Sequence, residues 1–197
     1  MASLNALLKR RTRTLLRSAL GLVLAFIVFT LAQSLEGKGP FTPDDPAPPG
    51  QYTVIDVADG DTIYVSMDGI RESIRLVGVD TPETHHPSKP AQCYGTEATQ
   101  FTRNLVKGKP VKLVADTKQP NRDKYGRLLR YVFLQDGREL NELLVTGGYA
   151  FVTNFNTEKK KEFRQLQEAA KNSRTGLWGA CTVKESGSYL QTNSVEM

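Results

Sequence analysis

Residues 51–79 read QYTVIDVADGDTIYVSMDGIRESIRLVGV and contain three strand patterns in a row. Residues 52–57 and 62–67 are rich in β-branched and aromatic side chains, and a third pattern lies at 73–79. The Asp-Gly pair at 68–69 is a hairpin signal between the second and third patterns. The stretch therefore predicts three consecutive strands at the start of a folded domain.

The chain after these strands alternates between helix and strand patterns. Apolar residues at helical spacing predict helices at 96–107, around 140–144 and around 163–170, and two further strands lie at 111–115 and 128–134. The resulting order is three strands, a helix, two strands and two helices. This order predicts an α+β fold that is mainly a β barrel, namely a five-stranded OB-fold barrel with about three packed helices.

The N-terminus combines a basic stretch with an apolar one. Five lysines and arginines precede residue 18, and the apolar sequence LGLVLAFIVFTLA follows at 20–32. This order predicts a secretory signal peptide or a single-pass membrane anchor within residues 1–35, with the basic end in the cytoplasm. A buried core helix and a mitochondrial presequence are the alternatives. We therefore expect an extracytoplasmic protein, either membrane-anchored or secreted.

The net charge of +5 belongs entirely to that N-terminus, because 21 basic and 21 acidic residues remain from residue 18 onward. Overall basicity therefore says nothing about a nucleic-acid partner. Local charge is more informative, because the stretch from Lys118 to Arg130 contains five basic residues and only one acidic residue, Asp123. Such a basic rim predicts salt-sensitive attraction of a phosphate backbone. The lysines at 159–161, which open the last predicted helix, are more simply explained as a solvated helix face.

Composition divides the rest of the chain. Residues 36–50 hold five prolines and three glycines and are predicted to form a linker. Residues 51–182 are predicted to form the folded domain, and residues 183–197 a disordered polar tail.

Cys93 and Cys181 lack the close spacing of a zinc site. In an oxidising compartment they predict one disulfide worth roughly 4–5 kcal/mol on the chain-entropy account. Two unpaired buried thiols are the alternative.

Three polar segments carry the candidate chemistry: DGDT at 59–62, RLVGVDTPET at 75–84 and DKYGR at 123–127. Each segment alone could be a turn or a solvated loop. Together they supply what phosphodiester cleavage needs, because carboxylates suit Ca²⁺ or Mg²⁺, paired guanidiniums bind phosphate, and a spare carboxylate can activate water. The residues in question are Asp61, Arg75, Asp80, Glu83 and Arg127.

These segments, with CYGTEAT at 93–99 and GLW at 176–178, resemble the staphylococcal (micrococcal) nuclease, or thermonuclease, family in order and spacing. The resemblance covers nearly the whole domain. It implies an OB-fold barrel and a calcium-dependent endonuclease that hydrolyses DNA and RNA to products with 3′-phosphate ends. By position, it implies that the carboxylates of Asp61 and Asp80 and the backbone carbonyl of Thr81 are Ca²⁺ ligands.

The resemblance also implies roles for the remaining site residues. Glu83 corresponds to the proposed general base, and Arg75 and Arg127 to the two arginines that bind the phosphate. Lys124 and Tyr125 match positions near the bound nucleotide. The histidines at 85–86 are more simply solvated loop side chains than metal ligands.

Residues 152–156 depart from the family, because they read VTNFN where its best-known member has tyrosines that stack on the nucleotide. Phe155 is a candidate stacking platform, and a core-facing Phe155 is the alternative.

A catalytically inactive nuclease-like OB module that binds nucleic acid or a protein partner is the alternative function, and a structural envelope spacer is a third. The presence of all five charged site residues favours the enzyme. The expected partners are DNA and RNA substrates, together with a membrane if the N-terminal segment is retained, and no protein partner is indicated.

Overall fold

The computed structural model of the protein describes residues 50–84, 90–187 and 189–195. The N-terminal segment, all of the linker before Gly50, and His85 and His86 lie outside the described residues, so the interpretations of them stay predictions. Across the described ranges, no helix combines the length and the apolar character needed to cross a membrane.

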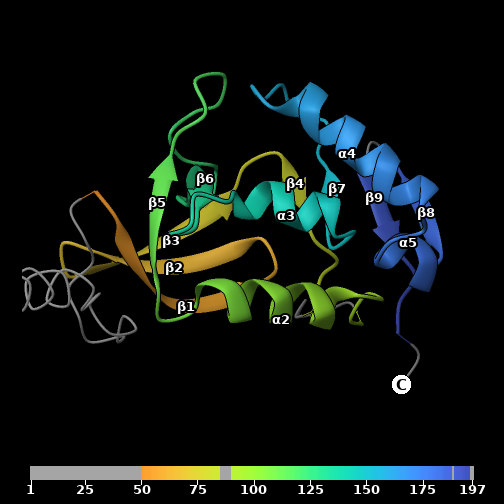
Figure 1. The fold of residues 1–197 in the computed structure, drawn as a ribbon, viewed down its shortest axis with the longest axis horizontal. Helices are drawn as coiled ribbons and strands as arrows, with labels where there is room; N and C mark the ends of the chain where they lie inside the picture. The colour runs from red at the N-terminus through yellow and green to blue at the C-terminus, as the bar shows by residue number, and fades with distance from the viewer. Residues whose placement is uncertain (1–49, 85–89, 188, 196–197) are drawn as a thin grey trace, which may run out of the picture. The chain divides into compact units, whose positions relative to one another are not determined.

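Five strands close into a barrel in the order β1-β2-β3-β6-β5 (Figure 1). Neighbouring strands run antiparallel, except that β3 and β6 are parallel. The five-stranded OB-type barrel predicted from the sequence is confirmed. The strands are β1 (Tyr52–Asp59), β2 (Thr62–Met67), β3 (Ile70–Leu76), β5 (Pro110–Val114) and β6 (Leu128–Phe133).

The barrel closes around alternate strand residues, as the period-2 pattern requires. Ile63 and Val65 on β2 are fully buried, and Ile74 on β3 lies opposite Ile63 in the strand register. Further core residues come from the other strands and from the helices packed outside: Val54, Val57, Leu76, Val111, Leu128, Val132, Leu140, Leu144 and Phe163.

Three predicted helices are present, namely α2 (Gly95–Val106), α3 (Leu140–Thr146) and α4 (Lys160–Asn172). In Figure 1, α2 runs along one side of the barrel beside β1. Asn141 fixes α3 to the barrel, because its buried amide donates to the Val77 carbonyl at 2.9 Å and accepts from the Val132 N–H at 3.0 Å. A fourth helix, α5 (Leu177–Ala180), is a single turn that the sequence patterns do not predict.

The predicted strand at 73–79 is interrupted. β3 ends at Leu76, and β4 (Val79–Asp80) pairs instead with β7 (Phe151–Val152). The break falls at Gly78, whose φ of 81° suits glycine and whose Cβ, if present, would lie 3.3 Å from the Phe163 ring. Residues 79–80 therefore leave the barrel wall, which places Asp80 beyond the end of β3.

The prediction of a disordered C-terminal tail is wrong for the described part of that tail. β8 (Val183–Ser186) and β9 (Tyr189–Thr192) form an antiparallel hairpin. The hairpin is fastened by contacts that are distant in sequence, which is why local composition missed it. Cys93 forms a disulfide with Cys181, its N–H donates to the Asn193 carbonyl at 2.8 Å, and its carbonyl accepts from Thr192 Oγ1 at 2.8 Å.

Candidate active site

The turn between β1 and β2 positions the first acidic residue of the site. The β1–β2 register shifts on either side of Val57, and such irregularities bend a strand near its end. Helix α2 holds the turn through Thr102, whose hydroxyl donates to the Gly60 carbonyl at 2.6 Å. A Cβ on Gly60 would lie 2.7 Å from Cγ2 of Thr81. Glycine at this position therefore lets the β1–β2 turn approach the segment that contains Thr81.

Asp61 is nearly buried, at 5% exposure. It connects the turn between β1 and β2 to the segment that contains Thr81. Its Oδ2 accepts the Thr81 N–H at 2.7 Å and the Thr81 hydroxyl at 3.1 Å. Its Oδ1 accepts the Thr62 hydroxyl at 3.1 Å. The carboxylate is thus fixed beside the backbone of residues 80–81.

Arg75 lies at the centre of the site because of its strand register. On β3 it pairs with Thr62 of β2 and with Leu129 of β6. This register places it between the polar segments at 59–62 and 123–127. Its Nη2 lies 2.6 Å from Oδ1 of Asp80 and 3.1 Å from Oδ2 of Asp61, and its Nη1 donates to two backbone carbonyls. Burial opposes the charge, but the surrounding carboxylates raise the pKa of Arg75 overall.

The acidic residues around Arg75 carry more negative charge than one guanidinium balances. Burial, followed by repulsion from Asp61, raises the pKa of Asp59 to about 7. Burial also raises the pKa of Asp80 to about 6, and Asp61 and Glu83 add to the rise while Arg75 opposes it. A divalent cation at this position would relieve the repulsion.

The donor set also fits a hard cation such as Ca²⁺. Ca²⁺ takes six to eight oxygen ligands from carboxylates, backbone carbonyls and water. The guanidinium contacts show that Asp61 and Asp80 lie close together, next to the backbone of Thr81. In the described part of the chain, no three His, Cys, Asp or Glu side chains form a metal cluster. If a calcium ion binds here, the oxygens available to hold it are those of Asp61, Asp80, the Thr81 carbonyl and water.

The raised pKa of Asp59 predicts a pH dependence of stability. Without metal, the native carboxyl binds a proton more tightly than the unfolded one, so the free energy of unfolding falls as pH rises from about 4 to about 7. Relative to Asp59→Asn, we expect the wild type to lose more than about 1.4 kcal/mol across this window, the equivalent of one pKa unit. Chelator-treated samples unfolded in urea at each pH measure the difference. Parallel curves for the two proteins would contradict the assignment.

Arg127 is positioned by Asp123, a residue to which the sequence analysis gave no role in the site. Asp123 Oδ1 accepts the backbone N–H groups of Tyr125 and Arg127 at 2.9 and 3.0 Å. Its Oδ2 accepts both Nε and Nη2 of Arg127 at 2.7 Å. Burial disfavours the charge on Asp123, but these hydrogen bonds lower its pKa overall. The loop thus fixes one edge of the Arg127 guanidinium.

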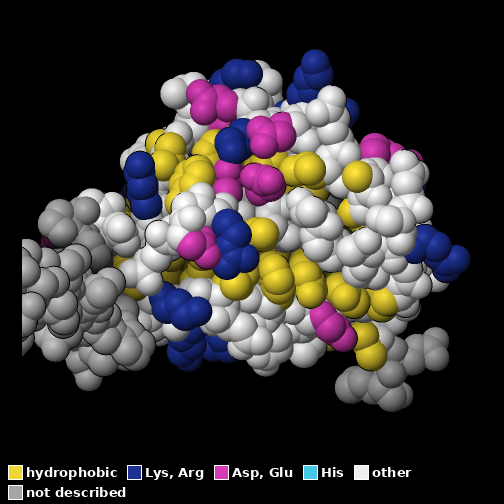
Figure 2. Space-filling model, in the orientation of Figure 1, with side chains coloured by type: hydrophobic (Ala, Val, Ile, Leu, Met, Phe, Trp, Pro, Cys, Tyr) yellow, Lys and Arg dark blue, Asp and Glu magenta, His cyan; other side chains and the backbone are white. Residues whose placement is uncertain are grey.

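Fewer of the basic residues between Lys118 and Arg130 line the site than the sequence predicts. Arg122 pairs with Glu72 at 2.9 Å, and Arg130 donates to Asn121 at 2.6 Å. Figure 2 shows lysines, arginines and acidic residues intermixed on the face it displays. The basic side chains that line the site are those of Arg75, Lys124 and Arg127.

Glu83 lies in a loop that the backbone and one side chain hold in place. Gln92 donates its N–H to the Glu83 carbonyl at 2.8 Å, and its Oε1 accepts the Glu83 N–H at 2.8 Å. A Cβ on Gly95 would lie 2.8 Å from the Pro82 carbonyl oxygen, so the loop sits tightly on the start of α2. Glu83 is close enough to Asp80 to raise the pKa of that carboxyl.

A cleft of about 500 Å³ opens beside the two arginines. Tyr125 and Phe155 line it, with exposures of 71% and 57%. The core-facing alternative for Phe155 is therefore wrong. Lys124 Nζ and Arg127 Cζ lie 5.0 and 5.3 Å from the centroid of the Tyr125 ring, within cation–π range.

The structure thus brings the sequence-predicted residues of all three segments together. It also adds three residues that motif matching did not single out. Asp59 and Asp123 stood inside the motifs themselves, where acidic neighbours of the assigned residues were a usable signal. Gln92 carried no such signal, because its role depends on a contact nine residues back in the chain.

The sequence of the chain is similar to those of known nucleases. The sequence profile described as "Staphylococcal nuclease homologue" matches residues 73–180. The chain is 36% identical to the thermonuclease of Staphylococcus hyicus, over 80% of this chain and 94% of the relative. The thermonuclease of Staphylococcus intermedius is 38% identical over 80% and 94%. Endonuclease YncB of Bacillus subtilis is 39% identical, over 61% of this chain and 57% of the relative. By the profile match and by these two thermonuclease relatives, the chain belongs to the staphylococcal nuclease homologue family.

Proposed function

We propose that the protein is a calcium-dependent endonuclease that hydrolyses DNA and RNA and leaves 3′-phosphate ends. The observation that carries this proposal is the contact of Arg75 with both Asp61 and Asp80, which brings the proposed calcium ligands and the proposed phosphate-binding guanidinium to one point. The cleft next to it is lined by Lys124 and Arg127. We further propose that the protein acts outside the cytoplasm, anchored by or released from its N-terminal segment.

In this proposal the two arginines hold the phosphate during the reaction. A guanidinium presents paired N–H donors that match phosphate oxygens, and its attraction grows as negative charge develops in the transition state. Asp123 fixes one edge of Arg127, so little orientational freedom is lost when substrate binds. Calcium, held by Asp61 and Asp80, would add charge stabilisation at the same phosphate.

Glu83 is the proposed base. Its carboxylate takes a proton from a water molecule, whose oxygen forms a bond to phosphorus while the bond from phosphorus to the 5′ oxygen breaks. The departing oxygen takes a proton from solvent. Gln92 holds the backbone of Glu83 at both its N–H and its carbonyl, which keeps the base near Asp80.

The test uses the full-length chain in detergent, incubated with plasmid DNA and with RNA in calcium or in chelator. We expect degradation of both substrates in calcium, none in chelator, and products whose free 5′ hydroxyls a polynucleotide kinase labels without prior phosphatase treatment. Asp80→Asn should need a higher calcium concentration. Salt-sensitive retention of DNA by folded protein, with no cleavage at any calcium concentration, would instead favour the inactive binding module.

A further inference from the structure

The C-terminal hairpin brings a third aromatic side chain to the active-site cleft. Tyr189, the first residue of β9, lines the same cleft as Arg75 and Arg127. It also lines an adjoining hollow of about 480 Å³ that contains Asp80. Tyr189 therefore stands at the border between the phosphate-binding arginines and the proposed cation ligand.

The exposed aromatic residues in the described part of the chain gather at this one place. Among the residues that the structure describes, the exposed aromatic side chains are those of Tyr125, Phe155 and Tyr189, and all three line this cleft. Tyr189 is 54% exposed. Clustered exposed aromatic rings beside cationic side chains are the combination with which proteins bind single-stranded nucleic acid, since rings stack on bases while cations hold phosphates.

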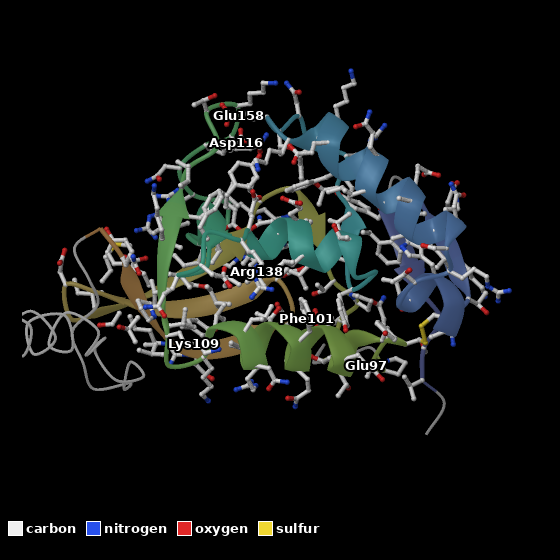
Figure 3. All side chains as sticks on the ribbon, viewed as in Figure 1. Glu97, Phe101, Lys109, Asp116, Arg138 and Glu158 are labelled. Atoms are coloured by element: carbon white, nitrogen blue, oxygen red, sulfur yellow. A yellow bond between two sulfur atoms is a disulfide. The ribbon has the colours of Figure 1, made fainter. Side chains whose placement is uncertain are left out.

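The base of the hairpin is anchored to the rest of the domain, and Tyr189 belongs to its paired strands. Four residue pairs join β8 to β9, including Ser186 with Tyr189. The far end of β9 is held by the Thr192 hydroxyl, which donates to the carbonyl of Cys93, a member of the disulfide. Figure 3 shows that disulfide at the N-terminal end of α2, near the labelled Glu97.

We propose that Tyr189 stacks on a nucleobase next to the phosphate being cleaved. This inference rests on the proposed function. The hairpin lies beyond residue 180, where the match to the family profile ends. Tyr189 supplies an aromatic surface in a cleft that Thr153 and Phe155 also line.

The test compares two single-stranded oligonucleotides of equal length, one with bases throughout and one with abasic sites flanking a single cleavable position. Initial rates give kcat and KM for full-length wild type, Tyr189→Ala and Tyr189→Phe. On the base-bearing strand, Tyr189→Ala should lose about 5- to 100-fold in kcat/KM, mainly through KM, which is the usual range for base–aromatic stacking. On the abasic strand it should match wild type within about twofold. Tyr189→Phe, which keeps the ring, should behave as wild type.

Ile70→Ala is the matched control, because Ile70 is an exposed apolar residue at the start of β3 and does not line the cleft. It should leave both strands unaffected. Equal losses for Tyr189→Ala on both strands would show that Tyr189 acts only through the fold, and no loss on either would show that it touches no base. Either result overturns the stacking role while leaving the nuclease intact. Absence of cleavage by folded wild type on every strand would overturn the proposed function and the inference with it.

Discussion

Replacing Glu83 with glutamine is expected to cut turnover by about 10²- to 10⁴-fold, the range that a positioned general base supplies. Glutamine keeps the size of the side chain but cannot take a proton. The backbone contacts between Glu83 and Gln92 do not involve the Glu83 carboxylate, so the loop should keep its place. Single-turnover cleavage of a labelled oligonucleotide measures the loss, and oligonucleotide affinity should change little.

Glu97→Gln is the control for this variant. Glu97 is an exposed carboxylate in the first turn of α2, and Figure 3 shows it on the outer part of the helix. The same change of charge there should leave turnover within about twofold, as expected for a surface substitution. If Glu83→Gln cleaved within tenfold of the wild type, Glu83 would have no part in proton transfer.

Replacing Arg127 with lysine is expected to lower kcat by about 10²- to 10³-fold, the usual cost of losing one donor group at a transition-state anion. Lysine keeps the positive charge but has no planar fork for the phosphate and cannot reproduce the Nε and Nη2 contacts with Asp123. Steady-state kinetics should show the loss mainly in kcat, because the phosphate gains its extra charge only in the transition state.

Arg138→Lys is the matched control for this variant, and Arg138 is labelled in Figure 3. Arg138 pairs with Asp136 through Nε at 2.8 Å and Nη2 at 2.7 Å, the same two atoms that Arg127 uses, but it lies outside the cleft. Arg138→Lys should therefore leave kcat unchanged. Equal kinetic effects of the two substitutions would mean that Arg127 contributes only an ion pair to the fold.

The barrel was predictable because its signals are local. Alternating β-branched residues marked the strands, and Asp68-Gly69 marked the first hairpin. The elements that escaped prediction depend on distant partners. β4 and β7 are only two residues long and exist through pairing with each other, and the hairpin of β8 and β9 is held by contacts to Cys93, about a hundred residues earlier.

The candidate site shows the same division. Asp61, Arg75 and Asp80 could be named from motifs, since their residue types and spacing suit a cation and a phosphate. Their arrangement could not, because it comes from the register that sets Arg75 opposite Thr62. Tyr189 stood in a segment whose polar composition predicted disorder, and nothing local indicated that it reaches the cleft.

The bond between Cys93 and Cys181 also determines how the protein should be prepared. Cys93 follows Gln92, the residue whose side chain and backbone hold Glu83, and its own N–H is tied to Asn193. Production in a thiol-rich cytoplasm, or storage with a reductant, removes the covalent anchor of this segment, so we expect the base to lose its fixed position. Weak cleavage by such material would reflect the reduced cysteines, and oxidative refolding should restore the rate.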